Sequence, residues 1–199
     1  MLSVFVGKNN KKRKKINKYF SAKQNSGDII EDYKKSGFYQ DIQMRDLFRI
    51  DYSDKTFLDE AIECTPNDTP SRQKIWEDNP QLVLKGNKIN PEFNMIRTIT
   101  TKQDRNPNSG NLYIDTGIAG KSRFRYLTPR ECLLFMGFED NDYENIKKYN
   151  TEIHKGSDMF PRDKIIRMAG NSIPVKLLEG IFLQIKIIEE QVLGNGRSQ

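Results

Sequence analysis

The stretch RYLTPRECLLFMGF, residues 125–138, carries the clearest structural signal in the chain. Thr128 stands directly before Pro129, and Glu131 follows the threonine by three positions. This is the pattern of a capping box with proline at the first helical position, and it predicts that a helix begins here. Apolar residues follow, and Gly137 suits the position just past the end of a helix. On physical grounds alone, the stretch predicts a short, well-capped core helix.

A second helix is predicted from about Pro174 onwards. Its apolar residues recur every three or four positions, at Leu178, Ile181, Phe182, Ile185, Ile188 and Val192. Because this spacing matches the period of an α-helix, it places one apolar stripe along several turns, with charged residues mostly off it. The stripe needs a core to cover it.

Four short segments have the composition of strands: 3–7, 81–84, 93–101 and 112–114. The polar, basic loop 103–111 joins the last two. Two strands with such a loop can offer side chains to a DNA groove. An ordinary surface hairpin has the same pattern, so both interpretations stay open.

The remaining segments give weaker signals. Ile29, Ile30 and Tyr33 have helical spacing, while residues 44–50 suit either a helix or a strand. Residues 65–92 are rich in proline, asparagine and aspartate, which predicts mostly loop.

Composition limits the class of protein. At 199 residues, of which 36% are hydrophobic, the chain suits one domain, or one domain and part of a second, with a modest core. No apolar run is long enough to span a membrane. Cys64 and Cys132 are too few for a disulfide framework, so a reduced, cytoplasmic setting is the default. With His154 as the only histidine, the sequence offers no metal site.

The positive charge is concentrated in two segments. The formal net charge is +6, but residues 1–27 hold eight Lys and Arg and no acid, including the run KKRKK at 11–15. From Arg97 to Arg130 there are seven basic residues against two acids. Two basic segments on a mildly acidic remainder suit a protein that lays particular surfaces against phosphates. For the KKRKK run alone, an ordinary solvated surface explains the pattern equally well.

Two motifs together resemble one enzyme family. Residues 127–138, LTPRECLLFMGF, resemble the ninth conserved motif of DNA (cytosine-5)-methyltransferases, and residues 169–175, AGNSIPV, resemble the tenth. RTITT, at 97–101, stands where the target-recognition domain of that family carries a Thr-Ile or Thr-Leu pair. SVFVG, at 3–7, is weakly similar to the strand after the eighth motif. The stretch between SVFVG and RTITT agrees with the family by position only.

Several signatures of the family are absent from this sequence. The Phe-x-Gly-x-Gly loop that cradles S-adenosylmethionine, the Pro-Cys-Gln loop with the nucleophile, Glu-Asn-Val and Gln-x-Arg-x-Arg do not occur. Neither cysteine resembles the nucleophile: Cys64 has a proline after it and not before it, and Cys132 lies on the predicted capped helix. The resemblance therefore covers the C-terminal part of such an enzyme without its chemistry, and it implies no catalytic residue here.

The resemblance implies a mixed α/β fold. We expect an irregular, small target-recognition domain, with a terminal strand and a terminal helix that belong to a Rossmann-like methyltransferase domain. The expected segments are a strand of the catalytic domain at 1–10, the target-recognition domain at 11–126, the ninth-motif helix and connection at 127–170, and a tenth-motif helix packing on the catalytic domain at 171–199.

The resemblance also implies functional residues. By the resemblance, Thr98 would touch the DNA backbone near the flipped base. Arg97, Lys102, Gln103 and Arg105 are candidates for contact with phosphates or base edges because Arg and Gln suit guanine and adenine edges, and all five have an ordinary surface side chain as the alternative. Asn171 and Ser172 would lie beside S-adenosylmethionine, although Asn and Ser are also favoured helix caps. Arg130 and Glu131 are expected to hold the domain together by an ion pair and capping.

Three hypotheses for function follow. First, the chain is the smaller subunit of a split methyltransferase that flips its target base in double-stranded DNA, completed by a partner chain with the cofactor loop and the Pro-Cys-Gln nucleophile. A start at Met1, close to the eighth-motif boundary, favours this hypothesis. Second, it is an inactive truncated fragment. Third, it is a sequence-specific DNA-binding module without catalysis. In isolation, a homo-oligomer would cover the apolar stripe of the last helix.

Overall fold

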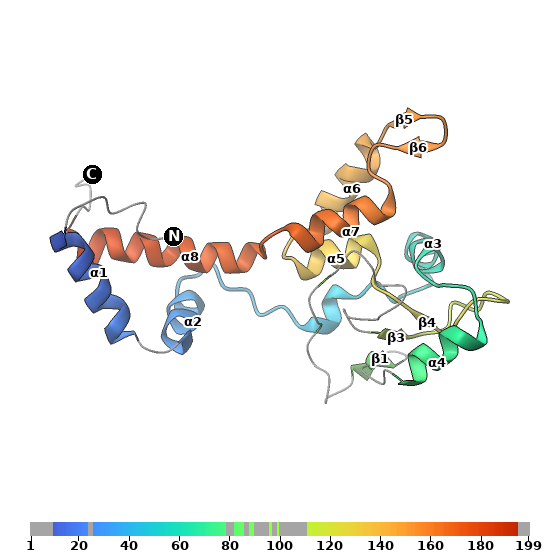
Figure 1. Cartoon of the computed structure of the whole chain (residues 1–199), viewed down its shortest axis with the longest axis horizontal. Coiled ribbons are helices and arrows are strands. Elements are labelled where there is room, and N and C mark those ends of the chain that lie inside the picture. Colours follow the sequence, from blue (N-terminus) through green and yellow to red (C-terminus); the bar gives the residue numbers. More distant parts are fainter. Residues whose placement is uncertain are drawn as a thin grey trace. The chain divides into compact units, whose positions relative to one another are not determined.

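The computed structural model describes residues 10–23, 26–78, 82–85, 88–89, 96, 99 and 111–194 (Figure 1). The chain divides into two compact units, residues 42–172 and residues 1–41 with 173–199. This division is coarser than the four segments expected from the sequence, which stay a prediction. None of the described helices is long and apolar enough to cross a membrane.

The unit of residues 42–172 mixes helices with two small sheets. Its elements are the 3-10 helix η2 (Met44–Leu47), α3 (Lys55–Glu63), α4 (Pro70–Asp78), β1 (Leu82–Lys85), β2 (Lys88–Ile89), β3 (Asn111–Tyr113), β4 (Phe124–Arg125), α5 (Pro129–Phe135), α6 (Asp140–Tyr149), β5 (Glu152–His154), β6 (Ser157–Asp158) and α7 (Arg162–Asn171). The larger sheet has the order β2-β1-β3-β4, with β1 parallel to β3 and the other neighbours antiparallel. β5 and β6 form a hairpin that projects beyond α6 and α7 (Figure 1). The expected mixed α/β class is confirmed.

The core of this unit gathers around α5 and α7, which pack against each other. Its buried members are Phe48, Ile99, Leu112, Leu127, Cys132, Leu133, Tyr143, Ile165, Ile166 and Ala169. Because they come from β3, from three helices and from the segments before them, the core joins the sheet to the helices. Burying one large apolar side chain stabilises a fold by about 1.5–3 kcal/mol. Such packing, more than helix propensity, holds helices as short as α5.

The unit of residues 1–41 and 173–199 is helical. It contains α1 (Asn10–Ala22), α2 (Ser26–Lys35), α8 (Val175–Ile187) and the π-helical turn η4 (Ile188–Val192). The hydroxyl of Tyr19 donates to Oε1 of Gln184 at 2.7 Å, and Nε2 of Gln184 donates to Asp32 at 3.1 Å. Lys23 also pairs with Asp32. Gln184 is buried, so one buried amide links both α1 and α2 to α8.

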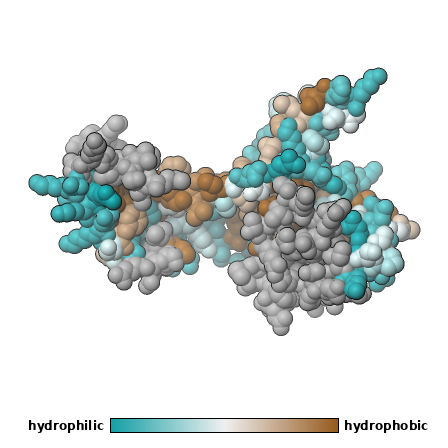
Figure 2. Space-filling view, in the orientation of Figure 1, coloured by the Kyte–Doolittle hydropathy of each residue, from teal (hydrophilic) through white to brown (hydrophobic). Residues whose placement is uncertain are grey.

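One side of α8 stays uncovered. Leu177 is 55% exposed, Ile181 45% and Phe182 64%, and Figure 2 shows hydrophobic surface over this helix. Ile188, farther along the predicted stripe, is buried. Of the predicted stripe, Ile181 and Phe182 are therefore uncovered and Ile188 is covered, while α2 packs on α8 and α1 packs on η4.

Two parts of unit 42–172 are more regular than predicted. Residues 65–92, predicted as mostly loop, contain α4. Oγ1 of Thr69 accepts a hydrogen bond from the N–H of Arg72 at 3.3 Å, directly before Pro70, so α4 begins with the same Thr-Pro signal as α5. After α5, where only a connection is expected, the chain forms α6, a hairpin and α7. α6 shows no apolar periodicity because it is mostly polar and buries only Tyr143. In α7 the buried residues are Ile165, Ile166 and Ala169, too few to show a helical period on their own.

Several weaker predictions are confirmed. β1 lies at the strand predicted for 81–84, and β3 at the strand predicted for 112–114. α2 confirms the helical spacing of the segment around Ile30. Residues 44–50 begin as η2 and continue as extended chain from Phe48.

Other predictions lie outside the described residues. These are the strand at 3–7, most of the strand at 93–101 and the loop at 103–111. Within 93–101 the structure describes Ile96 and Ile99, and neither belongs to a strand.

Candidate functional site

α5 is fixed at both ends by its own sequence. At its start, Oγ1 of Thr128 accepts from the N–H of Glu131 at 3.2 Å, and the Glu131 carboxylate accepts from the N–H of Thr128 at 2.9 Å. At its end, Gly137 has a φ of 84°. The amides of Gly137 and Phe138 donate to carbonyls of the last turn at 2.9 and 3.1 Å. These two bonds form a Schellman motif, which requires the left-handed conformation that glycine adopts without strain. The predicted helix and both predicted caps are confirmed.

Glu131 is also one half of a buried ion pair with Arg125. Nη1 and Nη2 of Arg125 each donate to one carboxylate oxygen at 2.8 Å, and both side chains are 0% exposed. The backbone N–H groups of Arg49 and Thr128 donate to the same carboxylate at 2.9 Å, so it accepts four hydrogen bonds. Burial works against the charged guanidinium, but the adjacent carboxylate outweighs it and raises the pKa of Arg125. The buried guanidinium is therefore kept charged and held in one geometry by Glu131.

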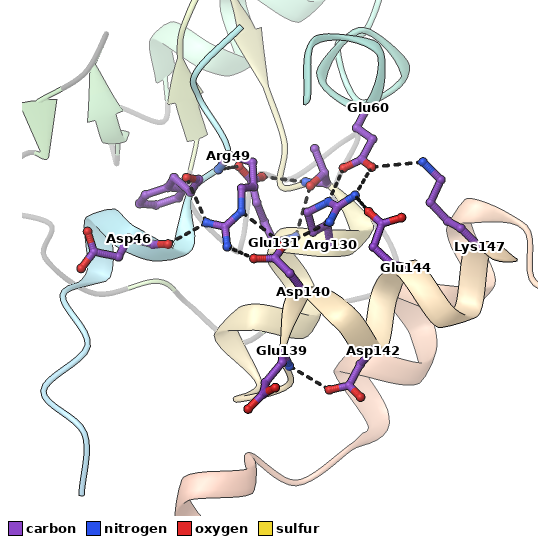
Figure 3. Close-up of polar contacts among 12 residues, drawn as sticks. Asp46, Arg49, Glu60, Arg130, Glu131, Glu139, Asp140, Asp142, Glu144 and Lys147 are labelled. Atoms are coloured by element: carbon purple, nitrogen blue, oxygen red, sulfur yellow. Dashed lines mark hydrogen bonds and ion pairs between the residues drawn. The ribbon is translucent and has the colours of Figure 1, made fainter. Parts of the chain in front are cut away.

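Arg130 ties α5 to α3 and α6 (Figure 3). Its guanidinium donates to both carboxylate oxygens of Glu60 at 2.8 and 2.9 Å, to Asp140 at 3.1 Å, and pairs with Glu144. The ring centroid of Tyr143 lies 4.6 Å from the guanidinium carbon, within cation–π range. Burial opposes the charge, but the hydrogen bonds to Glu60 and Glu144 raise the pKa of Arg130. The ion pairing and capping expected of this motif are both present.

α7 approaches the segment that carries the predicted DNA contacts. A Cβ built on Gly170 would lie 2.7 Å from the carbonyl oxygen of Ile99, closer than real Cβ atoms approach. Only glycine therefore fits against this backbone. Ile99 is 6% exposed and belongs to the same core as Ala169. Gly170 of the AGNSIPV motif and Ile99 of the RTITT segment, far apart in the sequence, thus meet in one unit, and no sequence spacing predicts that they do.

Asn171 and Ser172 lie at the end of α7. Asn171 is its last residue, and Ser172 caps it, with both its N–H and its Oγ donating to the carbonyl of Ala169 at 3.1 and 2.8 Å. Pro174 stands at the N-cap of α8, and no side chain caps that helix. The alternative in which Asn171 and Ser172 cap the last helix is therefore wrong, because Ser172 is used to end the preceding one. Asn171 is exposed, and its amide has no hydrogen-bond partner in the described part of the chain.

The five predicted DNA-contacting residues lie outside the described residues, and their contacts stay predictions. They are Arg97, Thr98, Lys102, Gln103 and Arg105. The described residue Ile99, next to Thr98 in the sequence, is itself buried in the core beside α7.

A groove that the sequence did not predict lies between the start of α4 and the β3–β4 connection. Its volume is about 670 Å³. In its wall, Oδ2 of Asp115 lies 3.6 Å from Nε of Arg123. The two carboxylate oxygens of Asp68 accept hydrogen bonds from Nε2 of Gln73 at 2.9 and 3.0 Å. Because carboxylates and cations are mixed there, the groove does not single out phosphate groups.

The two cysteines are packing residues. Cys64 and Cys132 are both 0% exposed. Burial raises the pKa of the Cys64 thiol, whereas a nucleophilic cysteine needs a thiolate that its substrate can reach.

The model of the C-5 cytosine-specific DNA methylase family matches residues 3–187. No curated protein matches the chain, and no solved structure does. The matched range covers nearly the whole chain and includes α5 with its caps, the buried ion pairs and the approach of Gly170 to Ile99. The chain belongs to the C-5 cytosine-specific DNA methylase family, whose members are DNA cytosine-5 methyltransferases.

Proposed function

We propose that this chain supplies target recognition and structural completion to a DNA (cytosine-5)-methyltransferase, as a subunit that a complementary chain completes. The observation that carries the proposal is the approach of Gly170 to Ile99, because it joins the AGNSIPV motif to the residue that follows Thr98 in the sequence. α5 supports this junction, since its buried ion pair and caps fix the core on which α7 packs. In the proposal, the recognition domain covers residues 11–126.

The reaction needs groups that this sequence does not carry. Carbon 5 of cytosine is a weak nucleophile, so a cysteine thiolate first adds to carbon 6 and makes carbon 5 an enamine carbon. S-adenosylmethionine supplies the methyl group. Cys64 is unsuited to the first step, because it is buried and its pKa is raised. In the proposal, the complementary chain brings both the Pro-Cys-Gln nucleophile and the cofactor loop.

This chain's share is to hold the DNA while the base is out of the stack. Flipping a cytosine costs a few kcal/mol, and contacts to the flanking phosphates and bases must offset that cost. The proposed contact residues are Arg97, Thr98, Lys102, Gln103 and Arg105. Arg and Gln side chains suit guanine and adenine edges as well as phosphates. Thr98 is proposed to touch the backbone beside the flipped base, because the core holds its neighbour in place.

Asn171 and Ser172 are proposed to form one edge of the cofactor site. The Asn171 carboxamide can both donate and accept, and the Ser172 oxygen keeps acceptor capacity after donating to Ala169. Residues 1–10 and 171–199 would then belong with the catalytic domain. The exposed apolar side of α8 is the surface that the complementary chain would cover.

The test is methyl transfer from labelled S-adenosylmethionine to duplex DNA in a purified mixture. We expect transfer when this chain is combined with the complementary chain, and none with either chain alone. A cysteine-to-serine change in the Pro-Cys-Gln loop of the complementary chain is the negative control. Transfer by one chain alone would contradict the split arrangement. An inactive mixture in which this chain still binds one duplex sequence would make it a DNA-binding module instead.

A further inference from the structure

We infer that α1 is a second DNA-contacting surface, which binds the phosphates of duplex DNA whatever their sequence. The inference rests on the proposed function, which brings the chain to DNA, and it assigns a partner to the KKRKK run. All six basic residues of α1 are exposed: Lys11, Lys12, Arg13, Lys14, Lys15 and Lys18. The helix contains no acid, and Figure 2 shows hydrophilic surface over it.

The charges on the later part of α1, from Arg13 to Lys18, have no acid of the described residues as a partner. In the described part of the chain, none of Arg13, Lys14, Lys15 and Lys18 forms an ion pair. α1 packs on η4, whose acids are Glu189 and Glu190, and Glu190 lies 4.0 Å from Lys186 instead.

These charges also weaken the helix that carries them. Lys14 and Lys18 are four positions apart and repel each other on one helix face. Basic residues in the first turn oppose the helix dipole as well. A solvated face with mixed charges would avoid both costs. Binding to an anionic partner would relieve both, and this favours a function for the run.

The partner is a polyanion in solution, not a membrane. A helix that lies on a membrane needs a free apolar face. The apolar residues of α1 are already used: Ile16 is buried, and Tyr19 bonds to Gln184 and packs edge-on against Phe20 at 5.4 Å. Duplex DNA is the polyanion on which this family acts.

The spacing of the helix suits a phosphate backbone. Lys14 and Lys18 are separated by about 6 Å along the helix axis. One DNA strand presents a phosphate about every 3.4 Å along its axis. Neighbouring lysines on one face can therefore reach separate phosphates of the same strand.

The test measures the affinity of the full chain for a fluorescein-labelled duplex of arbitrary sequence at several salt concentrations. The variant carries Lys14→Gln, Lys15→Gln and Lys18→Gln together, since glutamine keeps the helix propensity. The slope of log K against log salt is negative, and each lost phosphate contact lowers its magnitude by about 0.9. We expect the magnitude of this slope to be smaller by about 2 to 3 in the variant, with unchanged helical circular dichroism.

The matched control removes three exposed lysines elsewhere, Lys148, Lys155 and Lys164, and so changes the net charge equally. We expect its slope to fall by less than about 1. Equal slopes for the two variants would overturn the inference. It would also be overturned if the full chain bound vesicles of equal parts phosphatidylserine and phosphatidylcholine but did not bind the duplex. Methyl transfer by the mixture of both chains is measured in parallel. Methyl transfer together with an unchanged salt slope for the α1 variant would contradict this inference alone. A salt slope that depends on α1, without methyl transfer, would contradict the proposed function alone.

Discussion

Replacing Glu131 with glutamine probes the centre of the unit of residues 42–172 with a change of one atom. The carboxylate accepts four hydrogen bonds, two from Arg125 and one each from the backbone of Arg49 and Thr128. The amide of glutamine keeps one oxygen and places an NH₂ group where the other oxygen was. That NH₂ group faces donors, so two of the four hydrogen bonds are lost.

The magnitude follows from burial. Both Arg125 and Glu131 are 0% exposed, so water cannot replace the lost partner, and the guanidinium stays buried without its counter-charge. Removing one partner of a buried ion pair costs about 3–5 kcal/mol. Small domains have a total stability of about 5–15 kcal/mol, so Glu131→Gln should bring the domain close to unfolding.

Urea unfolding at neutral pH measures the effect, with the fluorescence of Trp76, the only tryptophan, as the probe. The matched control is Glu144→Gln, which removes the same charge from a side chain that is 51% exposed. Arg130 keeps Glu60 and Asp140 in that variant, so we expect a loss of less than about 1 kcal/mol. A loss below about 1 kcal/mol for Glu131→Gln, or equal losses for the two variants, would refute the reasoning.

Three more outcomes are expected. Gly170→Ala should lower the free energy of unfolding by about 1–2 kcal/mol, and with it the melting temperature, because the added Cβ meets the Ile99 carbonyl at 2.7 Å. Gly180→Ala, whose Cβ has no neighbour closer than 4.0 Å, should be neutral or stabilising. Equal shifts of the melting temperature for the two variants would be evidence against the close approach. Phe182→Asp, on the exposed side of α8, should leave circular dichroism unchanged but abolish co-purification with the complementary chain; intact co-purification would remove α8 from the interface. Because burial raises the pKa of Cys64, its thiol should resist Ellman's reagent at pH 8 in the folded chain, and rapid labelling without denaturant would contradict its burial. The contribution of this thiol to the free energy of unfolding should decline as pH rises above roughly 8.5, where the thiol ionises in the unfolded chain.

What the sequence predicted well is local. The start of α5 depends on Thr128 and Glu131, three positions apart, and its end on Gly137, so neighbouring residues contain the whole signal. The same Thr-Pro start occurs at Thr69 and Pro70, but no apolar run follows it, and the helix there is not predicted.

What the sequence could not predict depends on packing between distant segments. Glu60 and Arg130 are 70 positions apart, and no spacing rule selects that carboxylate over the other acids of the chain. The approach of Gly170 to Ile99 is of the same kind, since it exists only after α7 packs. Ser172 caps the end of α7, and this role could not be predicted because the sequence did not predict that helix. The resemblance identified the motifs, and the structure shows which of them touch.

The central claim is that this chain selects the cytosine that a complementary chain methylates. Bisulfite sequencing of DNA from cells that contain both chains tests it most directly. We predict methylated cytosines in one short sequence context, absent when either chain is missing and strongly reduced with Thr98→Ala. Methylation in the same context without this chain, or none with both chains present, would contradict the claim.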